Sequence, residues 1–278
     1  MPQLAVIANI CVGGKVANRD KILLWEDYAK TQPQIIIPVK HYIHGGMYAR
    51  EITIPKDTVL TGDIYKFDHF DLMISGDITV STDTGETKRI KGYNLFNGLS
   101  GKKRAGYAHE DTTWVTFHAV TGEDGDQIQK LITARNFEEL EEFYNSINRE
   151  DYYIMVSSTG MNDSDIKTQV ECTDDLISIF GEYEHLTVKK SKISGNGVFT
   201  NKKILTDSLI CKSRIDGKRT EAGRYTNHAV NNNAKMVFNG DDMELVSTKD
   251  IEENEEITVN YRDVINTRNN KGDLLCQV

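Results

Sequence analysis

The stretch GRYTNHAVNNNA, Gly223 to Ala234, decides how the rest of this chain is interpreted. It holds an Asn-His pair, Asn227 and His228, and three asparagines follow at 231–233. Asparagine tolerates left-handed backbone and bonds its own main chain, so the three asparagines predict a tightly folded loop. A polar pair inside such a loop is suited to presenting backbone groups to a ligand. Taken alone, however, an Asn-rich stretch predicts only a turn.

Two further stretches lie on either side of this loop. Upstream, KISGNGVFTNKKI (192–204) places Gly195 and Gly197 around Asn196, before an apolar pair. Because glycine has no Cβ and accepts positive φ, this turn would let a cofactor approach the backbone closely, although an ordinary β-turn explains it equally. The third glycine of the dinucleotide-binding pattern is absent. Downstream, KDIEENEEITVNYRD (249–263) is an acidic turn followed by an alternating strand that ends in tyrosine.

These three motifs, in this order and spacing, resemble the SET domain of protein lysine methyltransferases. In that family the pattern is roughly GxGVF, then RFxNHSxxPNA, then an acidic pair leading to ELTxxY. The resemblance covers about Glu184 to Asp263 and implies S-adenosylmethionine as the cofactor, with Tyr261 as the catalytic residue. The cofactor-binding residues that it implies are Gly195, Asn196, Gly197, Arg224, Tyr225, Asn227 and His228.

The chemistry of the implied reaction explains why a tyrosine would be needed. Methyl transfer from a sulfonium to an amine is an in-line displacement, and a lysine amine, with a pKa of about 10.4, must first lose its proton. A tyrosine hydroxyl and carbonyl oxygens can orient the amine, so no nucleophilic side chain or metal is required. The alternative interpretation is that Tyr261 is an ordinary aromatic residue of the core. Glu255 and Glu256 are predicted to form a solvated turn, and His228 to be structural rather than a general base.

The chain departs from the family pattern in three places. The interval between Val198 and Asn227 leaves little room for the segment that grips a substrate peptide, Asn232 stands near the usual proline, and only Cys276 follows Tyr261. The short form resembles uncharacterised bacteriophage SET-domain proteins. Two hypotheses follow. The first is an S-adenosylmethionine-dependent protein-lysine methyltransferase, phage-encoded. The second is a non-enzymatic structural or interaction protein with a degenerate SET fold, as a virion component or host-factor blocker.

Residues 35 to 120 form short runs rich in β-branched and aromatic residues between Gly, Asp and Pro turns, which predicts a β-sandwich or barrel. DLMISGDITV (71–80) and AGYAHEDTTWVTFHAV (105–120) resemble cupin motifs. His69, His109 and His118 could converge on a metal, but the HxH of the first motif is missing. We therefore predict a degenerate, structural cupin-like domain without a stoichiometric metal.

The fold class expected is mainly β (α+β), in four segments. They are an N-terminal strand and helix (1–34), a cupin-like β-barrel or sandwich (35–125), a helical connector and linker (126–183), and a compact SET-like β fold (184–278). A helix is expected over Asn18–Lys30. The connector should hold two short helices in 126–149, with Asn136 and Glu139 as a capping box, a linker at 157–165 and a helix at 173–180.

The composition of the chain limits the kinds of partner that the protein is expected to bind. The 278 residues carry a net charge of −9, which argues against a general nucleic-acid or membrane-surface binder. No apolar run approaches the length of a membrane span, and the four cysteines form no CxxC pair. The expected partner is a lysine-bearing protein substrate or another host or phage protein, and a homo-oligomer remains open. The expected location is the cytoplasm, that of the host cell for a phage-encoded protein, with the virion as the alternative.

Overall fold

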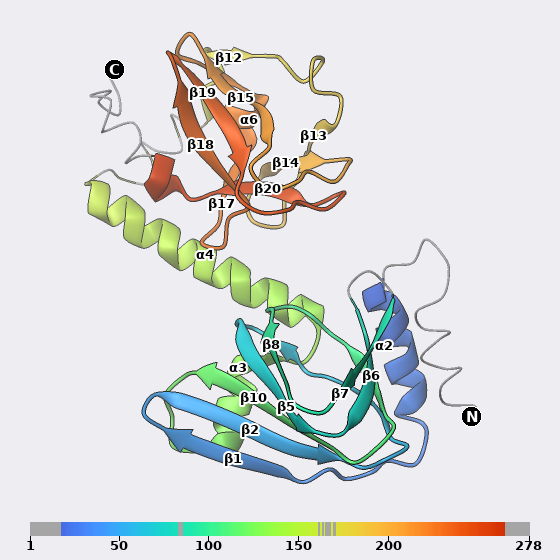
Figure 1. Cartoon of the computed structure of the whole chain (residues 1–278). Helices are drawn as coiled ribbons and strands as arrows, with labels where there is room; N and C mark the ends of the chain where they lie inside the picture. The colour runs from blue at the N-terminus through green and yellow to red at the C-terminus, as the bar shows by residue number, and fades with distance from the viewer. Residues whose placement is uncertain are drawn as a thin grey trace. The chain divides into compact units, whose positions relative to one another are not determined.

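The computed structural model describes residues 18–82, 86–160 and 171–264, together with 162, 164 and 168. The chain divides into two compact units, Met1–Phe143 (unit 1) and Tyr144–Val278 (unit 2). Both are built mainly of β-strands with a few helices, which confirms the expected fold class (Figure 1). The strand expected near the N-terminus lies outside the described residues.

Unit 1 contains two antiparallel sheets. The larger has the spatial order β1 (Val39–His44), β2 (Met47–Ile54), β10 (Thr112–Ala119), β5 (His69–Ser75) and β8 (Asn94–Gly98). The smaller has the order β3 (Val59–Thr61), β9 (Ala105–Ala108), β6 (Asp77–Ser81) and β7 (Thr87–Lys91). A short pair joins β4 (Ile64–Tyr65) to β11 (Thr133–Ala134). The β-rich runs seen in the sequence therefore form strands, and their buried faces share one apolar core.

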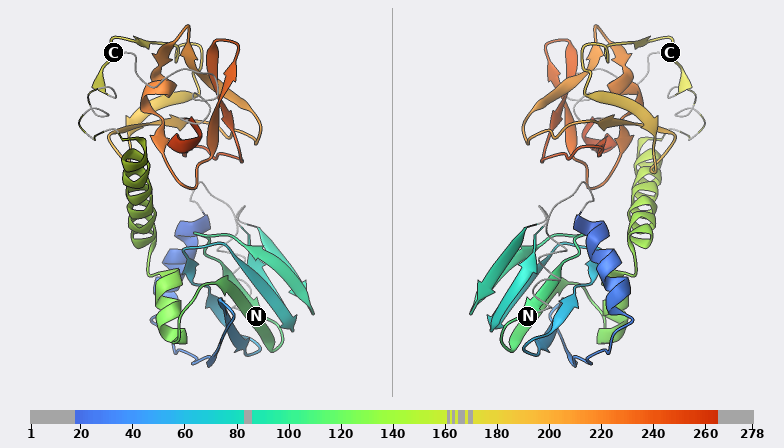
Figure 2. Two further views of the ribbon diagram at one scale, coloured as in Figure 1. Left: turned by 90° about the vertical axis from the view of Figure 1, so that its left-hand side faces the viewer. Right: turned by 90° about the vertical axis from the view of Figure 1, so that its right-hand side faces the viewer.

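In the described part of unit 1, two helices belong wholly to this unit. Helix α2 (Asn18–Ala29) confirms the predicted first helix and packs beside β9, where its Ile22 meets Ala105 (Figure 2). Helix α3 (Gly125–Ile132) begins at Asp124, whose carboxylate accepts a hydrogen bond from the Gln127 amide at 2.8 Å. Such a cap satisfies a helix-end donor that has no partner within the helix. Among the described residues, no helix is both long and apolar enough to cross a membrane.

Helix α4 (Phe137–Thr159) starts in unit 1 and continues in unit 2. The Asn136 side chain accepts from the Glu139 amide at 2.8 Å, which confirms the N-cap half of the predicted capping box. The prediction of a short helix here is wrong, because α4 has 23 residues. It runs through YYIMV (152–156) and through the first residues of the linker predicted at 157–165. The last two residues of YYIMV, Met155 and Val156, are buried, so this part of the helix belongs to the packed interior.

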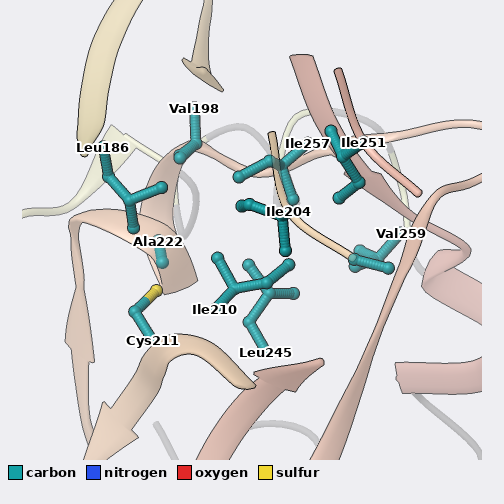
Figure 3. Packing of buried hydrophobic residues seen from close by; sticks show 11 residues of the cluster. Leu186, Val198, Ile204, Ile210, Cys211, Ala222, Leu245, Ile251, Ile257 and Val259 are labelled. Atoms are coloured by element: carbon teal, nitrogen blue, oxygen red, sulfur yellow. The ribbon is translucent and has the colours of Figure 1, made fainter. Parts of the chain in front are cut away.

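Unit 2 contains two further sheets around a second core. The first has the order β12 (Leu176–Ile177), β16 (Lys218–Thr220), β15 (Leu209–Ile215), β19 (Asp242–Ser247) and β18 (Ala234–Asn239). The second has the order β13 (Leu186–Lys190), β14 (Asn196–Thr200), β20 (Glu256–Val259) and β17 (Asn227–His228). Figure 3 shows the aliphatic side chains that both sheets contribute to this core.

The helix predicted over Thr173–Phe180 is wrong, because β12 forms there and pairs in parallel with β16. Long-range ion and hydrogen-bond partners explain the difference. The Asp175 carboxylate receives two bonds from the Arg219 guanidinium, at 2.7 and 2.6 Å. The Glu221 carboxylate accepts from the Ile179 amide at 2.9 Å. These contacts hold the segment extended against β16, and local sequence contains no trace of them.

Candidate functional site

The three sequence motifs come together in unit 2 through strand pairing. Strand β20 pairs antiparallel with β14 and parallel with β17, so it lies between the glycine turn and the Asn-His pair. Each motif therefore reaches the same region from a different part of the chain. Because two neighbouring strands hold β20, residues at its end are placed by the sheet rather than by a free loop.

Asn227 holds the glycine turn to β20. Its side-chain amide donates to the carbonyl oxygens of Ser194 at 3.0 Å and Asn196 at 3.1 Å, and to the Glu256 carboxylate at 2.8 Å. The other carboxylate oxygen of Glu256 accepts from the Ser191 hydroxyl at 2.8 Å. The amide group of Asn227 is thus fully used inside the protein, and it supports the turn rather than reaching outward.

Glycine serves a different structural purpose at each of the two positions in the turn. A Cβ on Gly197 would overlap the Glu256 carboxylate, so this glycine makes room for that side chain. Gly195 has a positive φ of 51° and would meet no atom within 4 Å. The open side of the turn is therefore at Gly195, where a ligand can approach the backbone closely.

Glu255 and Glu256 do not form the solvated turn predicted from the sequence. Glu256 bridges the glycine turn and Asn227, and the Glu255 carboxylate accepts from Asn233 at 3.0 Å and from the Glu252 amide at 2.9 Å. Sequence reasoning missed these roles. The signal available was strand alternation, which places Glu256 on the same face of β20 as the buried Thr258.

The asparagine loop is clamped to β20, as its composition predicted. Buried Asn233 accepts from the Thr258 amide at 2.8 Å and donates to the Glu256 carbonyl at 2.8 Å. Asn232 bonds the Ala234 carbonyl at 2.8 Å. None of the three asparagines adopts the left-handed backbone. Side-chain hydrogen bonds to backbone therefore shape this loop.

His228 is a neutral, structural histidine. The Tyr261 amide donates to its Nδ1 at 3.2 Å, so Nε2 carries the hydrogen and donates to Asp151 at 3.1 Å. Burial lowers the pKa of His228, and the neighbouring Asp151 carboxylate offsets only part of this. Arg262 also donates to the Asp151 side chain. With both ring nitrogens occupied, His228 orients the backbone before Tyr261.

Asp151 is the residue that sequence reasoning missed altogether. It lies on α4, 77 positions before His228 and 111 positions before Arg262, in a segment predicted to be a connector. Nothing in its local sequence marks it, because its partners come from the far end of the chain.

Tyr261 follows β20 and faces the core. Its hydroxyl donates to the Thr226 carbonyl at 2.9 Å, and its ring lies 5.3 Å from that of His228. Burial raises the pKa of Tyr261 well above its ordinary value. The result is a buried, neutral phenol that donates to a backbone carbonyl.

Arg224 and Tyr225 lie in α6 (Glu221–Tyr225). The Arg224 guanidinium stacks over the Tyr225 ring at 4.9 Å, and Tyr225 packs on the same core cluster as Tyr261. The positive charge of Arg224 acts on Tyr261 in the direction that favours its ionisation, against the larger effect of burial. The Nε of Arg224 is buried with no hydrogen-bond partner among the described residues.

The predicted site residues thus form two adjoining groups. Gly195, Asn196 and Gly197 surround the amide of Asn227, while Arg224, Tyr225 and His228 lie around Tyr261. Asn227 and His228 are neighbours in β17 and join the two groups.

The three histidines predicted as candidate metal ligands, His69, His109 and His118, do not converge. His69 and His118 stack with ring centroids 4.8 Å apart, but His109 instead bonds Thr79 at 2.8 Å on the other sheet. In the part of the chain that the structure describes, no three His, Cys, Asp or Glu side chains are grouped to hold a metal ion.

Comparison with known proteins gives two results. The SET domain family matches residues 46–262, whereas no curated protein matches the chain. Similar solved structures include KdgF from Halomonas sp., at 17% identity over 34% of this chain and 92% of that one, with a TM-score of 0.28. A cupin superfamily protein from Desulfitobacterium hafniense has 8% identity over 32% of this chain and 83% of that one, with a TM-score of 0.27. A conserved protein from Streptococcus pyogenes has 15% identity over 33% of this chain and 80% of that one, with a TM-score of 0.27.

Proposed function

Because the chain belongs to the SET domain family, we propose that unit 2 is an S-adenosylmethionine-dependent protein-lysine methyltransferase. The observation that carries this proposal is the pair of oxygens formed by the Tyr261 hydroxyl and the Thr226 carbonyl, 2.9 Å apart. Asn227, which follows Thr226 in the chain, bonds the turn that is open at Gly195.

The residues present fit the cofactor. The open backbone at Gly195 suits close approach of its methionine end, and the buried, unpartnered Nε of Arg224 is a donor suited to a carboxylate. Asn227 would contribute indirectly, since its amide already holds the Ser194–Asn196 turn. When bound, the cofactor supplies an electrophilic methyl group on a positively charged sulfur.

The protein's part is to bring a neutral amine into line with that methyl group. A lysine amine has a pKa of about 10.4 in water, and a buried site disfavours its charged form. The Tyr261 oxygen and the Thr226 carbonyl can accept hydrogen bonds from the amine and orient its lone pair. In the displacement the N–C bond forms as the C–S bond breaks, and the surplus proton on nitrogen then passes to solvent. Because Tyr261 is neutral, its role is orientation and weak CH···O contact rather than proton removal.

The second hypothesis, a non-enzymatic interaction protein, is favoured by one observation. Asn227 with Glu256 and His228 with Asp151 are paired to one another, so these polar groups are satisfied by the fold alone. A structural protein with a retained SET framework would show the same pairs.

One experiment separates the two hypotheses. Calorimetric titration with S-adenosylmethionine, beside methyl transfer from labelled cofactor to lysine-containing cell extract, is carried out on the parent chain and on Tyr261→Phe. Tyr261→Phe should bind the cofactor with unchanged affinity and transfer methyl roughly ten- to a thousandfold more slowly, because the hydroxyl acts in the transition state. Tyr153→Phe, at an exposed tyrosine of α4, is the matched control and should change neither.

A second variant tests whether the glycine turn contributes to cofactor binding. Asn227→Ala should weaken cofactor binding, since the three hydrogen bonds that hold the turn are lost. If the parent chain binds no S-adenosylmethionine at millimolar concentration, the enzyme proposal fails. If it binds but Tyr261→Phe transfers methyl at the parent rate, the catalytic assignment of Tyr261 fails.

A further inference from the structure

Unit 1 encloses a cavity that the proposed methyl transfer does not use. It has a volume of about 290 Å³ and is lined by both sheets. Since one water occupies about 30 Å³ of liquid, this is room for roughly ten water-sized groups. Its walls include aliphatic side chains such as Ile52 and Ile78, the Trp114 ring, and two arginines, Arg50 and Arg104.

Strand register places a polar row beside an apolar row on the cavity wall. Across β2, β10 and β5, Arg50 lies opposite Thr116, and Thr116 lies opposite Asp71. Two positions along, Ile52 lies opposite Trp114. Because side chains alternate along a strand, both rows point to the same face. The wall therefore combines a charged end with an apolar surface.

The acidic group of this row already has partners within the protein. Asp71 accepts from the Trp114 indole at 2.9 Å, and its other oxygen lies 3.5 Å from His69 Nε2. Asp63, at the cavity edge, accepts from Gln129 at 3.2 Å. Neither carboxylate lies within ion-pair distance of a cavity arginine.

The two arginines lack such partners. Among the described residues, no carboxylate lies within ion-pair distance of Arg50 or Arg104, and the Nε atom of each is buried without a hydrogen-bond partner. Burial lowers the pKa of the nearby His118, and the positive charge of Arg50 acts in the same direction. A buried donor without a partner is costly, so an anion in the cavity would stabilise the protein by accepting hydrogen bonds from these two Nε atoms.

We propose that this cavity binds a small organic monocarboxylate. Its carboxylate is held by Arg50 and Arg104, since a planar guanidinium matches a carboxylate in two parallel hydrogen bonds. Its apolar body lies against Ile52, Ile78 and the Trp114 ring. The apolar wall and the small volume favour a singly charged organic acid over inorganic phosphate, which has no apolar part. The site needs no metal ion.

The test uses benzoate and hexanoate as probes on the full chain, with benzyl alcohol as the neutral counterpart of benzoate. Binding is measured by ligand-observed NMR and by tryptophan fluorescence, because Trp114 lines the cavity. At least one of the two acids should bind about tenfold or more tightly than the alcohol, and Arg50→Gln or Arg104→Gln should remove that advantage, because a hydrogen bond between charged groups is stronger than one between neutral groups. Arg135→Gln, whose side chain is 89% exposed outside the cavity, is the matched control and should leave binding unchanged.

Three outcomes would overturn the proposal. The first is that neither acid binds at millimolar concentration. The second is that the acids bind no more tightly than benzyl alcohol, or equally to the parent chain and to both cavity variants. The third is displacement of the acids by an equal concentration of inorganic phosphate. If one cavity variant fails to fold, the other variant and the acid–alcohol comparison on the parent chain still decide.

Discussion

Lowering the pH should destabilise unit 1 through a single buried imidazole. His118 is 2% exposed, and neither of its ring nitrogens has a hydrogen-bond partner in the described part of the chain. Burial, with the nearby charges of His69 and Arg50, lowers its pKa from 6.5 to about 4, against the opposing effect of Asp71. At a pH between these two pKa values, His118 is protonated in the unfolded chain but stays neutral in the folded chain. The stability of unit 1 is therefore lost as the pH falls through this window.

The size of the loss follows from the two pKa values. Proton linkage predicts almost no change in the free energy of unfolding at about pH 7.5. It predicts a decrease of about 2 kcal/mol at about pH 5 and of about 3 kcal/mol at about pH 4. With an m-value of about 1–3 kcal/mol/M, the loss at about pH 5 would move the urea midpoint by roughly 1 M.

Tryptophan fluorescence is a selective assay for this effect. The chain has two tryptophans, Trp25 and Trp114, and both lie in unit 1. Urea unfolding is compared between the parent chain and His118→Phe, which keeps an aromatic ring and removes both nitrogens. The variant should be at least as stable at neutral pH and should lose about 2 kcal/mol less by about pH 5. Equal losses in the two proteins would refute the argument that His118 is held neutral by burial.

Two further predictions concern unit 2, and both can be followed by thermal unfolding with tyrosine circular dichroism. Gly223→Ala should destabilise by about 1–3 kcal/mol, because the added Cβ would overlap the Ser213 carbonyl oxygen, whereas Gly181→Ala meets open space and should cost little. Asn233→Ala should cost about 2–4 kcal/mol, since its buried amide makes three hydrogen bonds, against about 1 kcal/mol for Asn232→Ala, which loses one. Equal effects within either pair would contradict these assignments.

Features that depend on neighbouring residues were predictable from the sequence. The alternating runs became strands, the first helix begins at Asn18 as expected, and Asn136 caps α4. The three motifs of unit 2 meet because strand β20 pairs with both of the others. The strands and the helix cap depend on local interactions or on strand alternation, whereas the meeting of the three motifs was expected from the resemblance to the SET domain.

Features that depend on distant partners were not predictable. Asp175 is held extended by Arg219, 44 positions away, where local propensity favoured a helix. Asp151 belongs to the site because His228 and Arg262 reach it across long intervals of chain. Glu256 reads as a surface residue, but its carboxylate fills the space that Gly197 leaves. Strand alternation indicates the face of β20 on which Glu256 lies, but a single sequence does not identify the distant partner of any of these three residues.

The central position of β20 also sets the order in which the chain can assemble during synthesis. Among the described strands this one, Glu256–Val259, is the last to leave the ribosome, yet β14, β17 and Asn233 all depend on it for partners. At about 5–20 residues per second, the roughly hundred residues between Asp151 and Glu256 take about 5–20 s to translate. During that interval unit 1 is already complete, while the edge of β14 and the Asn-His segment remain open. We therefore expect nascent unit 2 to rely on chaperones until its final strand arrives.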